Sequence, residues 1–256
     1  MITIISPAKT LDFESEYEVD NLTNPDDLEV SKRVIKKLRT LSKKKLGALM
    51  NINHDLVEVN TMRYQEWTTN LNNAQTQPAL LAFNGEVYRG LDAKSFSDTD
   101  LKYAQEHLRI LSGLHGILRP LDRLQAYRLE IGTSIPVGRK KNLYDLWRDR
   151  VTERLNQQLK VLGTDCIINL ASTEYSKVVD FKRIDGQVII PVFKDLKNGE
   201  YKVVMTWAKS ARGKMASYII RNRIEKPEDL KGFEDYSYND RLSTENEWVF
   251  TREGYP

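Results

Sequence analysis

The sequence predicts a single domain of mixed α/β (α+β) architecture, in which a mixed β-sheet is flanked by helices. The chain has 256 residues, enough for one large domain or two small ones with a sizeable core. Short apolar runs typical of buried strands, such as CIINL at 166–170, alternate with longer stretches of helical periodicity. No internal repeat, linker or low-complexity segment interrupts the sequence. We therefore assign residues 1–256 to one domain.

The composition is that of a globular protein with a well-charged surface. Hydrophobic residues make up 40% of the sequence and charged residues 29%. No apolar run approaches the roughly 20 residues that span a bilayer, and MITIISPAKT has no basic residue before its short apolar run, unlike a signal peptide. We therefore expect a cytoplasmic protein without a membrane partner. The net charge of +3 is weak support for a polyanionic partner, so the distribution of charge matters more.

In the first half of the chain, apolar patterning and capping residues predict two strands and several helices. Ile2–Ile5 reads as a strand that ends at Ser6-Pro7. Helices are expected from Asn24-Pro25, from Ser42 to Met50, from Asp55 to Trp67 and from Ser97 to His107. The apolar run ALLAF, residues 79–83, is typical of a buried strand and leads into a glycine-punctuated turn, GEVYRGL at 85–91.

The second half contains the clearest helix of the sequence, which Asn142 begins and Gly163 stops. A strand at 166–170 leads into a capped helix start at 171–175. The later elements are a hairpin of strands 187–193 and 201–206 around Asn198-Gly199, a helix at 207–224, a short helix at 227–233 and a last strand at 248–251, which we place at an edge of the sheet.

The stretch LRILSGLHGILRPLDRLQAYRLEIG, residues 108–132, is the main candidate for a binding site. Gly113 and Gly116 bracket Leu114-His115, and closely spaced glycines can leave backbone N–H groups free to converge on an anion. Arg119 and Arg128 supply guanidinium groups suited to phosphate. The alternative is a tight turn between a strand and a short helix, with the arginines in solvent.

Two other segments supply candidate cations. Lys9 follows the first strand, near Asp12, but the spacing of a P-loop is absent, and both residues are alternatively ordinary loop residues.

In the helix at 207–224, Lys209 and Arg212 lie three apart on the flank of an apolar stripe, and Gly213 leaves room for a close approach. No acidic residue lies between Lys209 and Ile224, which favours an anionic partner. If Lys209 and Arg212 form one wall of an anion site and Gly113 to Arg119 the other, these distant segments must meet in the fold.

The sequence offers little for a transition metal. The single cysteine, Cys166, lies in an apolar run and reads as part of a buried strand. None of the three histidines, His54, His107 and His115, has metal-ligand spacing to another histidine or to the cysteine. We therefore expect no cofactor and no protein-held metal.

Several blocks of the sequence resemble one known family. They are ISPAKTLD at 5–12, GEVYRGL at 85–91, LRILSGLHGILRPLD at 108–122, YRLEIG at 127–132, INLASTEY at 168–175 and AKSARGKM at 208–215. In this order, over almost the whole chain, they closely resemble the bacterial YaaA family of peroxide-stress-resistance proteins.

The resemblance implies a role in surviving hydrogen peroxide and in keeping free intracellular iron low. It also implies DNA binding by a basic cleft beside a helix-hairpin-helix-like element, for which residues 111–122 are the matching segment. Two residues, rather than one, separate the two glycines of that segment here. With the residues above, the resemblance predicts contacts to DNA phosphates by Gly113, Gly116, Arg119, Lys209 and Arg212, and by Lys9 and Arg128, without strong sequence specificity.

Two other functions remain open. An enzyme acting on a nucleotide or another anionic small molecule is favoured by the polar groups Lys9 with Asp12, Arg128 with Glu130, and Ser172 with Glu174 and Tyr175. An iron-handling or protein-interaction role is the third, and the scarcity of histidine and cysteine disfavours direct iron binding. Convergence of Lys9, Glu130, Glu174 and Arg212 in a closed pocket would favour the enzyme, whereas an open basic groove would favour DNA. The oligomeric state is left open.

Overall fold

The structure is a computed structural model of the chain and describes residues 1–15, 17 and 19–253. Its helices are α1 (Leu28–Arg39), α2 (Lys43–Met50), α3 (His54–Glu66), α4 (Ala79–Ala82), α5 (Glu86–Leu91), α6 (Asp98–His107), α7 (Leu143–Leu162), α8 (Thr173–Ser176) and α9 (Met205–Arg221). Its strands are β1 (Ile2–Ile5), β2 (Thr10–Leu11), β3 (Gln77–Pro78), β4 (Phe83–Asn84), β5 (Leu108–Ser112), β6 (Gly116–Leu118), β7 (Arg123–Leu124), β8 (Cys166–Asn169), β9 (Gln187–Lys197), β10 (Glu200–Lys202), β11 (Ser237–Tyr238) and β12 (Glu247–Arg252). Short 3-10 helices are η1 (Leu71–Asn73), η2 (Ala93–Ser95), η3 (Phe181–Arg183), η4 (Pro227–Gly232) and η5 (Asp240–Leu242).

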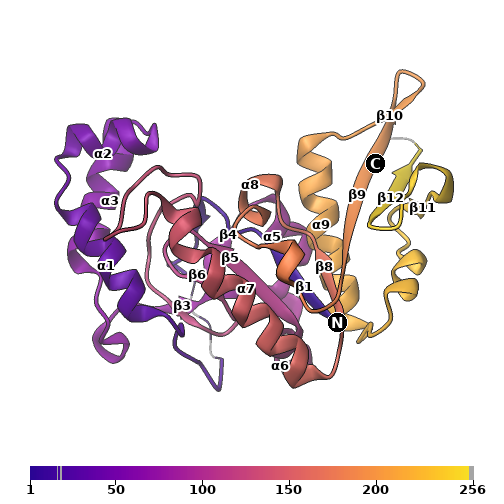
Figure 1. Cartoon of the computed structure of the whole chain (residues 1–256), viewed down its shortest axis with the longest axis horizontal. Helices are drawn as coiled ribbons and strands as arrows, with labels where there is room; N and C mark the ends of the chain where they lie inside the picture. Colours follow the sequence, from indigo (N-terminus) through magenta and orange to yellow (C-terminus); the bar gives the residue numbers. More distant parts are fainter. Residues whose placement is uncertain (16, 18, 254–256) are drawn as a thin grey trace.

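A mixed sheet forms the centre of the molecule (Figure 1). Within the described residues it has eight strands, in the order β11-β12-β9-β8-β1-β5-β6, with β10 paired to β9. The strands β12, β9, β8, β1 and β5 are parallel, whereas β6, β10 and β11 are antiparallel to their neighbours. Helices α1 to α3 gather at one end of the molecule, and α9 lies beside β9 at the other. The predicted mixed sheet flanked by helices is confirmed.

The order of the parallel strands reverses beside β1. Numbered along the chain, these strands lie in the order 2-1-3-4-5, because β5 adds to one side of β1 and β8 to the other. In open α/β sheets of this order, ligands bind in the crevice outside the carboxyl ends of the strands at such a switch point. The crevice here begins just after Ile5 and Asn169.

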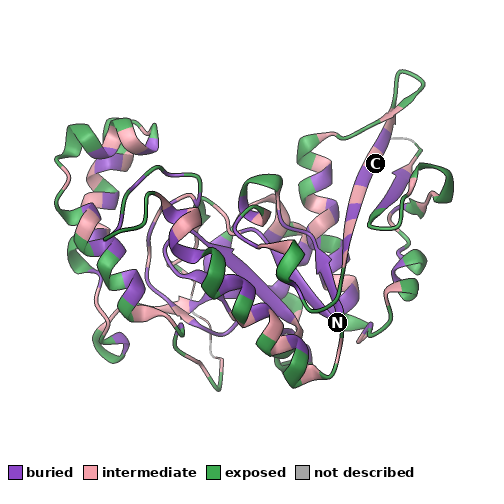
Figure 2. Ribbon diagram, in the orientation of Figure 1, coloured by how far each residue is buried: buried purple, intermediate pink, exposed green. Residues whose placement is uncertain are grey.

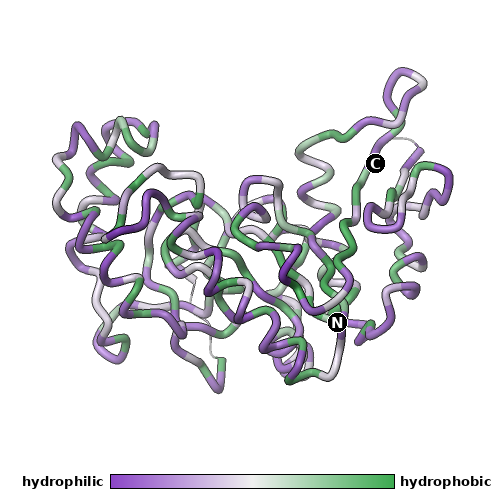
Figure 3. The backbone as a smooth tube through the Cα atoms, viewed as in Figure 1, coloured by the Kyte–Doolittle hydropathy of each residue, from purple (hydrophilic) through white to green (hydrophobic). Residues whose placement is uncertain are grey.

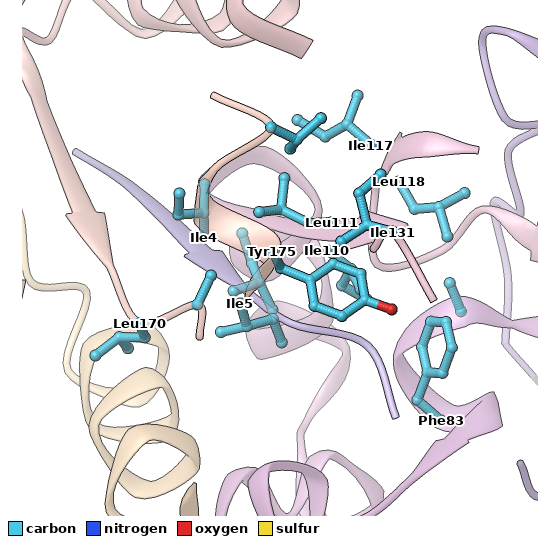
Figure 4. Close-up of a cluster of buried hydrophobic side chains, with 14 of the residues drawn as sticks. Ile4, Ile5, Phe83, Ile110, Leu111, Ile117, Leu118, Ile131, Leu170 and Tyr175 are labelled. Atoms are coloured by element: carbon cyan, nitrogen blue, oxygen red, sulfur yellow. The ribbon is translucent and has the colours of Figure 1, made fainter. Parts of the chain in front are cut away.

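The core lies on and around the central strands (Figure 2). All four residues of β1 and all four of β8 are buried, as expected for parallel strands covered on both faces. Hydrophobic segments follow the same central region in Figure 3. Figure 4 shows Ile4, Ile110 and Leu118, from three adjacent strands, in one buried cluster with Tyr175 beside it.

The helix ends agree with the capping residues of the sequence. Asn142 caps α7, since its Oδ1 accepts a hydrogen bond of 2.9 Å from the Asp145 N–H, and Gly163 ends the helix in the left-handed region. Ser97 and Asp100 form a capping box at the start of α6. The predicted helices at 142–162 and 97–107 are therefore confirmed, as are the strand at 166–170 and the hairpin around Asn198-Gly199.

Several local predictions are wrong. Residues 79–82 form helix α4 rather than a strand, because a short apolar run does not distinguish the two and Ala-Leu-Leu-Ala is a good helix former. The first helix begins at Leu28, with Asp27 before it, and not at Asn24-Pro25. Strand β12 is not an edge strand, since it lies between β9 and β11. The strand predicted at 201–206 is shorter, since β10 covers Glu200–Lys202 and α9 begins at Met205.

The segment at 111–122, matched to a helix-hairpin-helix-like element, folds differently. Strands β5 and β6 pair in an antiparallel hairpin, with Ile110 opposite Leu118 and Ser112 opposite Gly116. The isoleucine and leucine residues of this segment lie in two buried strands of the sheet. No helix lies between residues 108 and 124. The helix-hairpin-helix detail is not confirmed.

None of the helices among the described residues has the length and apolar character needed to cross a membrane.

Candidate functional site

A cavity of about 330 Å³ lies at the carboxyl ends of β1 and β8, at the switch point of the sheet. We call it the switch-point pocket. Its lining residues are Ser6, Pro7, Ala8, Lys9, Thr10, Asn84, Gly85, Glu86, Val87, Tyr88, Glu130, Leu170, Ser172, Glu174, Tyr175, Lys209 and Arg212. They come from the loops after β1 and β8, from the start of α5, from the segment after the β5–β6 hairpin and from α9.

Hydrogen bonds between serines join the two strand ends that form the floor of the pocket. Ser6 Oγ accepts a hydrogen bond of 2.8 Å from the Ser172 N–H and lies 3.2 Å from Ser172 Oγ. The hydroxyl of Tyr88 donates to the carbonyl of Ser6 at 3.0 Å, which ties α5 to the end of β1. Ser172 also caps α8. The floor is therefore held by bonds between residues far apart in the sequence.

A close crossing of α5 and α9 brings the basic flank of α9 to the pocket. A Cβ atom on Gly213 would lie 1.9 Å from the carbonyl oxygen of Val87, and one on Gly90 would lie 2.2 Å from that of Ser210. Because neither residue has a side chain, the two helices meet backbone to backbone. Gly213 thus does allow a close approach, as predicted, but the backbone that approaches it is that of α5 and not a ligand. Arg212, next in the chain, lines the pocket.

An acidic side chain is held between two cations on one side of the pocket. Glu130 Oε1 lies 3.1 Å from Lys9 Nζ and 3.3 Å from the Arg128 guanidinium. Glu130 Oε2 is buried and has no hydrogen-bond partner among the described residues. Lys9 is 65% exposed and Arg128 is largely buried, so Glu130 contacts one cation on the solvent side and one in the interior.

Phenols lie near this carboxylate. Burial, and then the charge of Glu130, raise the pKa of Tyr64 well above its ordinary value, and burial is also the main reason for the raised pKa of Tyr127 and Tyr175. These phenols remain neutral at physiological pH. They can donate hydrogen bonds but do not supply a phenolate base.

Arg212 is the most unusual group of the pocket. It is partly buried, and burial lowers its pKa, with no carboxylate acting in the opposite direction. Neither Arg212 nor the exposed Lys209 has an ion pair or side-chain hydrogen bond within the described part of the chain. Removing a guanidinium from water without a counter-charge is unfavourable. The arrangement is therefore suited to an anion that neutralises Arg212 and Lys209 when it binds.

The structure brings together only some of the candidate residues from the sequence. Lys9, Lys209 and Arg212 line the switch-point pocket, and Arg128 contacts its Glu130. Asp12 does not join Lys9, because its carboxylate contacts Lys94 at 3.0 Å instead. Glu130, Glu174 and Arg212, together with Lys9, line one pocket, which is neither fully enclosed nor an open groove.

Gly113 and Gly116 lie elsewhere, inside the β5–β6 hairpin. A Cβ on Gly113 would lie 2.2 Å from the carbonyl oxygen of Leu129, and one on Gly116 would lie 2.5 Å from the ring of Trp147. Gly116 also has a positive φ of 71°. Both are buried, and the nearby N–H of His115 donates to Ser112 Oγ. Protein atoms thus fill the space that these glycines leave.

Arg119 is held by carboxylates. Its guanidinium lies 3.0 Å from Asp122 and 3.3 Å from Asp26, and it donates to the Asn24 carbonyl. It does not line the switch-point pocket. The wall predicted from Gly113 to Arg119 is therefore not part of the pocket that Lys209 and Arg212 line, whereas the loops after β1 and β8 are.

Metal-ligating groups are not gathered in the described residues, where no set of three or more histidine, cysteine, aspartate or glutamate side chains is placed to hold a metal ion. Cys166 is buried in β8, as predicted, and burial raises the pKa of its thiol to about 11.

Sequence reasoning missed Ser6 and the apolar side of the pocket, formed in part by Val87 and Tyr88. A signal for Ser6 existed, because polar residues follow two apolar strands, in ISPAK and in INLAS. Reading it required the strand order, since only adjacent parallel strands place such ends together.

The comparisons with known proteins place the chain in a family. Residues 1–242 match the family model described as peroxide stress protein YaaA. The chain is 46% identical to a UPF0246 protein of Colwellia psychrerythraea over 254 residues, which cover 98% of this chain and 99% of that protein. It is 45% identical to a UPF0246 protein of Aliivibrio fischeri over 255 residues, covering 99% and 98% of the two chains. The chain therefore belongs to the family of peroxide stress protein YaaA.

Proposed function

We propose that the protein serves the peroxide stress response by binding a nucleotide or another compact anionic molecule in the switch-point pocket and acting on it there. Membership of a family named for peroxide stress supports the physiological role. The observation that carries the molecular proposal is the partly buried, unpaired Arg212 beside Lys209. The role in limiting damage by free iron, which the resemblance implies, is also part of the proposed physiological role.

The shape of the site favours a small ligand. Cations and carboxylates converge from five segments on a cavity of about 330 Å³, within the usual size range of small-molecule sites. In the proposed complex, Arg212 and Lys209 hold the anion. Glu86, Glu130 and Glu174 line the same cavity, and a protein that only holds a phosphate backbone does not require carboxylates there.

Titration calorimetry with adenosine 5′-monophosphate and inorganic phosphate tests this proposal. We expect heat of binding with the wild-type protein and an affinity lower by about tenfold or more in Arg212→Gln, which corresponds to one charge-assisted hydrogen bond. Lys94→Gln is the matched control, because Lys94 is an exposed cation paired with Asp12 outside the pocket. Equal affinities in wild type and Arg212→Gln would overturn the proposal.

Duplex DNA is the second candidate, held through its phosphates with little sequence specificity. It is supported by the exposure of Lys9 and Lys209 at the pocket, where a polymer can reach them. Binding would then weaken steeply with salt, and Arg212→Gln would lower the slope of log K against log salt by about one unit. A flat salt response in a titration with unrelated duplexes would exclude this candidate.

A further inference from the structure

We infer that the anion of the switch-point pocket is the terminal phosphate of a phosphate monoester carried on a compact, apolar body. This inference rests on the proposed function and specifies its ligand class.

The first support is the number of cations left without a partner. Among the lining carboxylates, Glu86 pairs with Arg89, and Glu130 pairs with Lys9 and Arg128. The third, Glu174, has no ion pair within the described part of the chain and is exposed, so solvent screens its charge. Lys209 and Arg212 have no such partner in the described residues. A phosphate monoester carries about −1.5 to −2 charges near pH 7 and offers three oxygens, whereas a carboxylate or a phosphodiester carries one charge. Two free cations, one of them a forked guanidinium, suit the monoester best.

The second support is the set of carboxylates beside those cations. Glu86, Glu130 and Glu174 line the same cavity from three different segments. Glu174 is exposed, and its Oε1 reaches to 3.0 Å from the position that a Cβ on Gly132 would take. A duplex carries one negative charge per roughly 1.7 Å of its axis, so it would bring phosphates against these carboxylates. A single terminal phosphate directed at Arg212 avoids this repulsion.

The third support is the apolar surface that faces the same space. Pro7, Ala8, Val87, Leu170 and the ring of Tyr175 contribute to the lining. Small-molecule sites combine a mostly apolar wall with a few placed polar groups that fix orientation. The pocket therefore suits a ligand with a phosphate at one end and a compact apolar or aromatic body at the other.

Phenyl phosphate and its diester, methyl phenyl phosphate, are the probes for this inference, because they share the body and differ in phosphate charge. At pH 7.5 we expect titration calorimetry to show an affinity about tenfold or more higher for phenyl phosphate. In Arg212→Gln this preference should shrink to a few-fold, whereas Lys94→Gln should retain it.

The dependence on pH gives an independent readout. A monoester loses its second charge near pH 6, so phenyl phosphate should bind more weakly at pH 5.5 than at pH 7.5, and the diester should not change. The charged groups that face the phosphate are Lys9, Lys209, Arg212, Glu86, Glu130 and Glu174, and the phenols are those of Tyr88 and Tyr175. Burial raises the pKa of both phenols, and no histidine or cysteine lines the pocket in the described residues.

The outcomes separate this inference from the function on which it rests. Equal binding of the two probes that is lost in Arg212→Gln would overturn the monoester while leaving an anion pocket. No binding of either probe, nor of inorganic phosphate and adenosine 5′-monophosphate, would overturn the pocket itself. A 5′-phosphorylated single strand is also tested as a competitor of phenyl phosphate. If it competes at a lower concentration than phenyl phosphate, and its unphosphorylated form does not compete, the monoester is the end of a nucleic-acid strand. That result would overturn the inference of a compact, apolar ligand body.

Discussion

Two regions of this molecule combine glycines with arginines, and they use them differently. In the β5–β6 hairpin, Gly116 packs against Trp147 and Arg119 pairs with Asp122. At the switch-point pocket, Gly213 allows α5 and α9 to cross closely, and Arg212 is left without a counter-charge. The first region is satisfied within the protein, whereas the second has charge that a ligand can neutralise.

The difference shows what separates a structural motif from a candidate binding site. Glycine spacing and nearby cations describe both regions equally well in the sequence. A partly buried cation without a partner is a property of the fold. Such a cation favours the binding of an anion, because its desolvation is otherwise uncompensated. We therefore expect substitutions in the hairpin to change stability and those in the pocket to change binding.

The largest effect is expected for Gly116→Ala. The new methyl group would lie 2.5 Å from the Trp147 ring at a positive φ of 71°, so both overpacking and backbone strain should lower the free energy of unfolding, by about 3 kcal/mol or more. Gly138→Ala is the matched control, with a φ of 60° and nothing within 4 Å of the added methyl group, and should cost only about 1 kcal/mol. Urea denaturation measures both. Equal losses would contradict a tightly packed hairpin.

The next largest effect is the change in stability with pH that His115, inside the hairpin, should cause. Burial lowers the pKa of this imidazole from 6.5 to about 3. The unfolded chain takes up the proton near pH 6.5 and the folded chain does not, so stability is full above pH 6.5 and falls as the pH drops toward 3. The loss reaches about 2 kcal/mol at pH 5.

Urea denaturation between pH 7 and 5 should therefore show a smaller loss of stability in His115→Gln than in wild type. His54→Gln is the control, because His54 is exposed on α3. A wild-type slope retained in His115→Gln would show that this imidazole is not held neutral by the hairpin.

How much of this could be predicted from the sequence depends on the range of the interactions. The capped helix from Asn142 and the buried strand at Cys166 follow from local patterns, and they are confirmed. The strand predicted at 79–83 was wrong for residues 79–82, because a run of five apolar residues fits either a helix or a strand.

The site was only partly predictable for a related reason. Lys9, Lys209 and Arg212 stood out as cations near glycines or strand ends. The meeting of Ser6 with Ser172 depends on β8 lying beside β1, and the place of Arg212 depends on the crossing of α5 and α9. No local pattern states which strands or helices are neighbours. Arg119 and Asp122 are only three residues apart, so their ion pair could have been predicted from the sequence. Nothing in the sequence showed that Asp122 would be buried.

Smaller effects are expected when Arg119 and Arg212 are replaced, and each replacement should change a different property. Arg119→Gln removes the ion pair of Asp122, whose side chain is only 2% exposed, and should cost about 1–3 kcal/mol of stability without changing affinity for phenyl phosphate. Arg212→Gln should leave stability nearly unchanged, because the guanidinium has no partner to lose, and should lower that affinity. In the double variant the effects should add within about 0.5 kcal/mol. Coupling in binding would return Arg119 to the site.

The smallest effect is expected for Cys166, at the end of β8 opposite to the switch-point pocket. Peroxide oxidises the thiolate, and burial raises the pKa of this thiol to about 11, so little thiolate forms at physiological pH. Cys166→Ala should therefore leave peroxide survival of a complemented strain unchanged, with a stability cost of about 1 kcal/mol for the lost contacts. Mass spectrometry of the wild-type protein after peroxide treatment should find the thiol unmodified. A folded Cys166→Ala protein that no longer protects cells would assign a role in the peroxide response to this thiol and contradict the proposed role of the pocket.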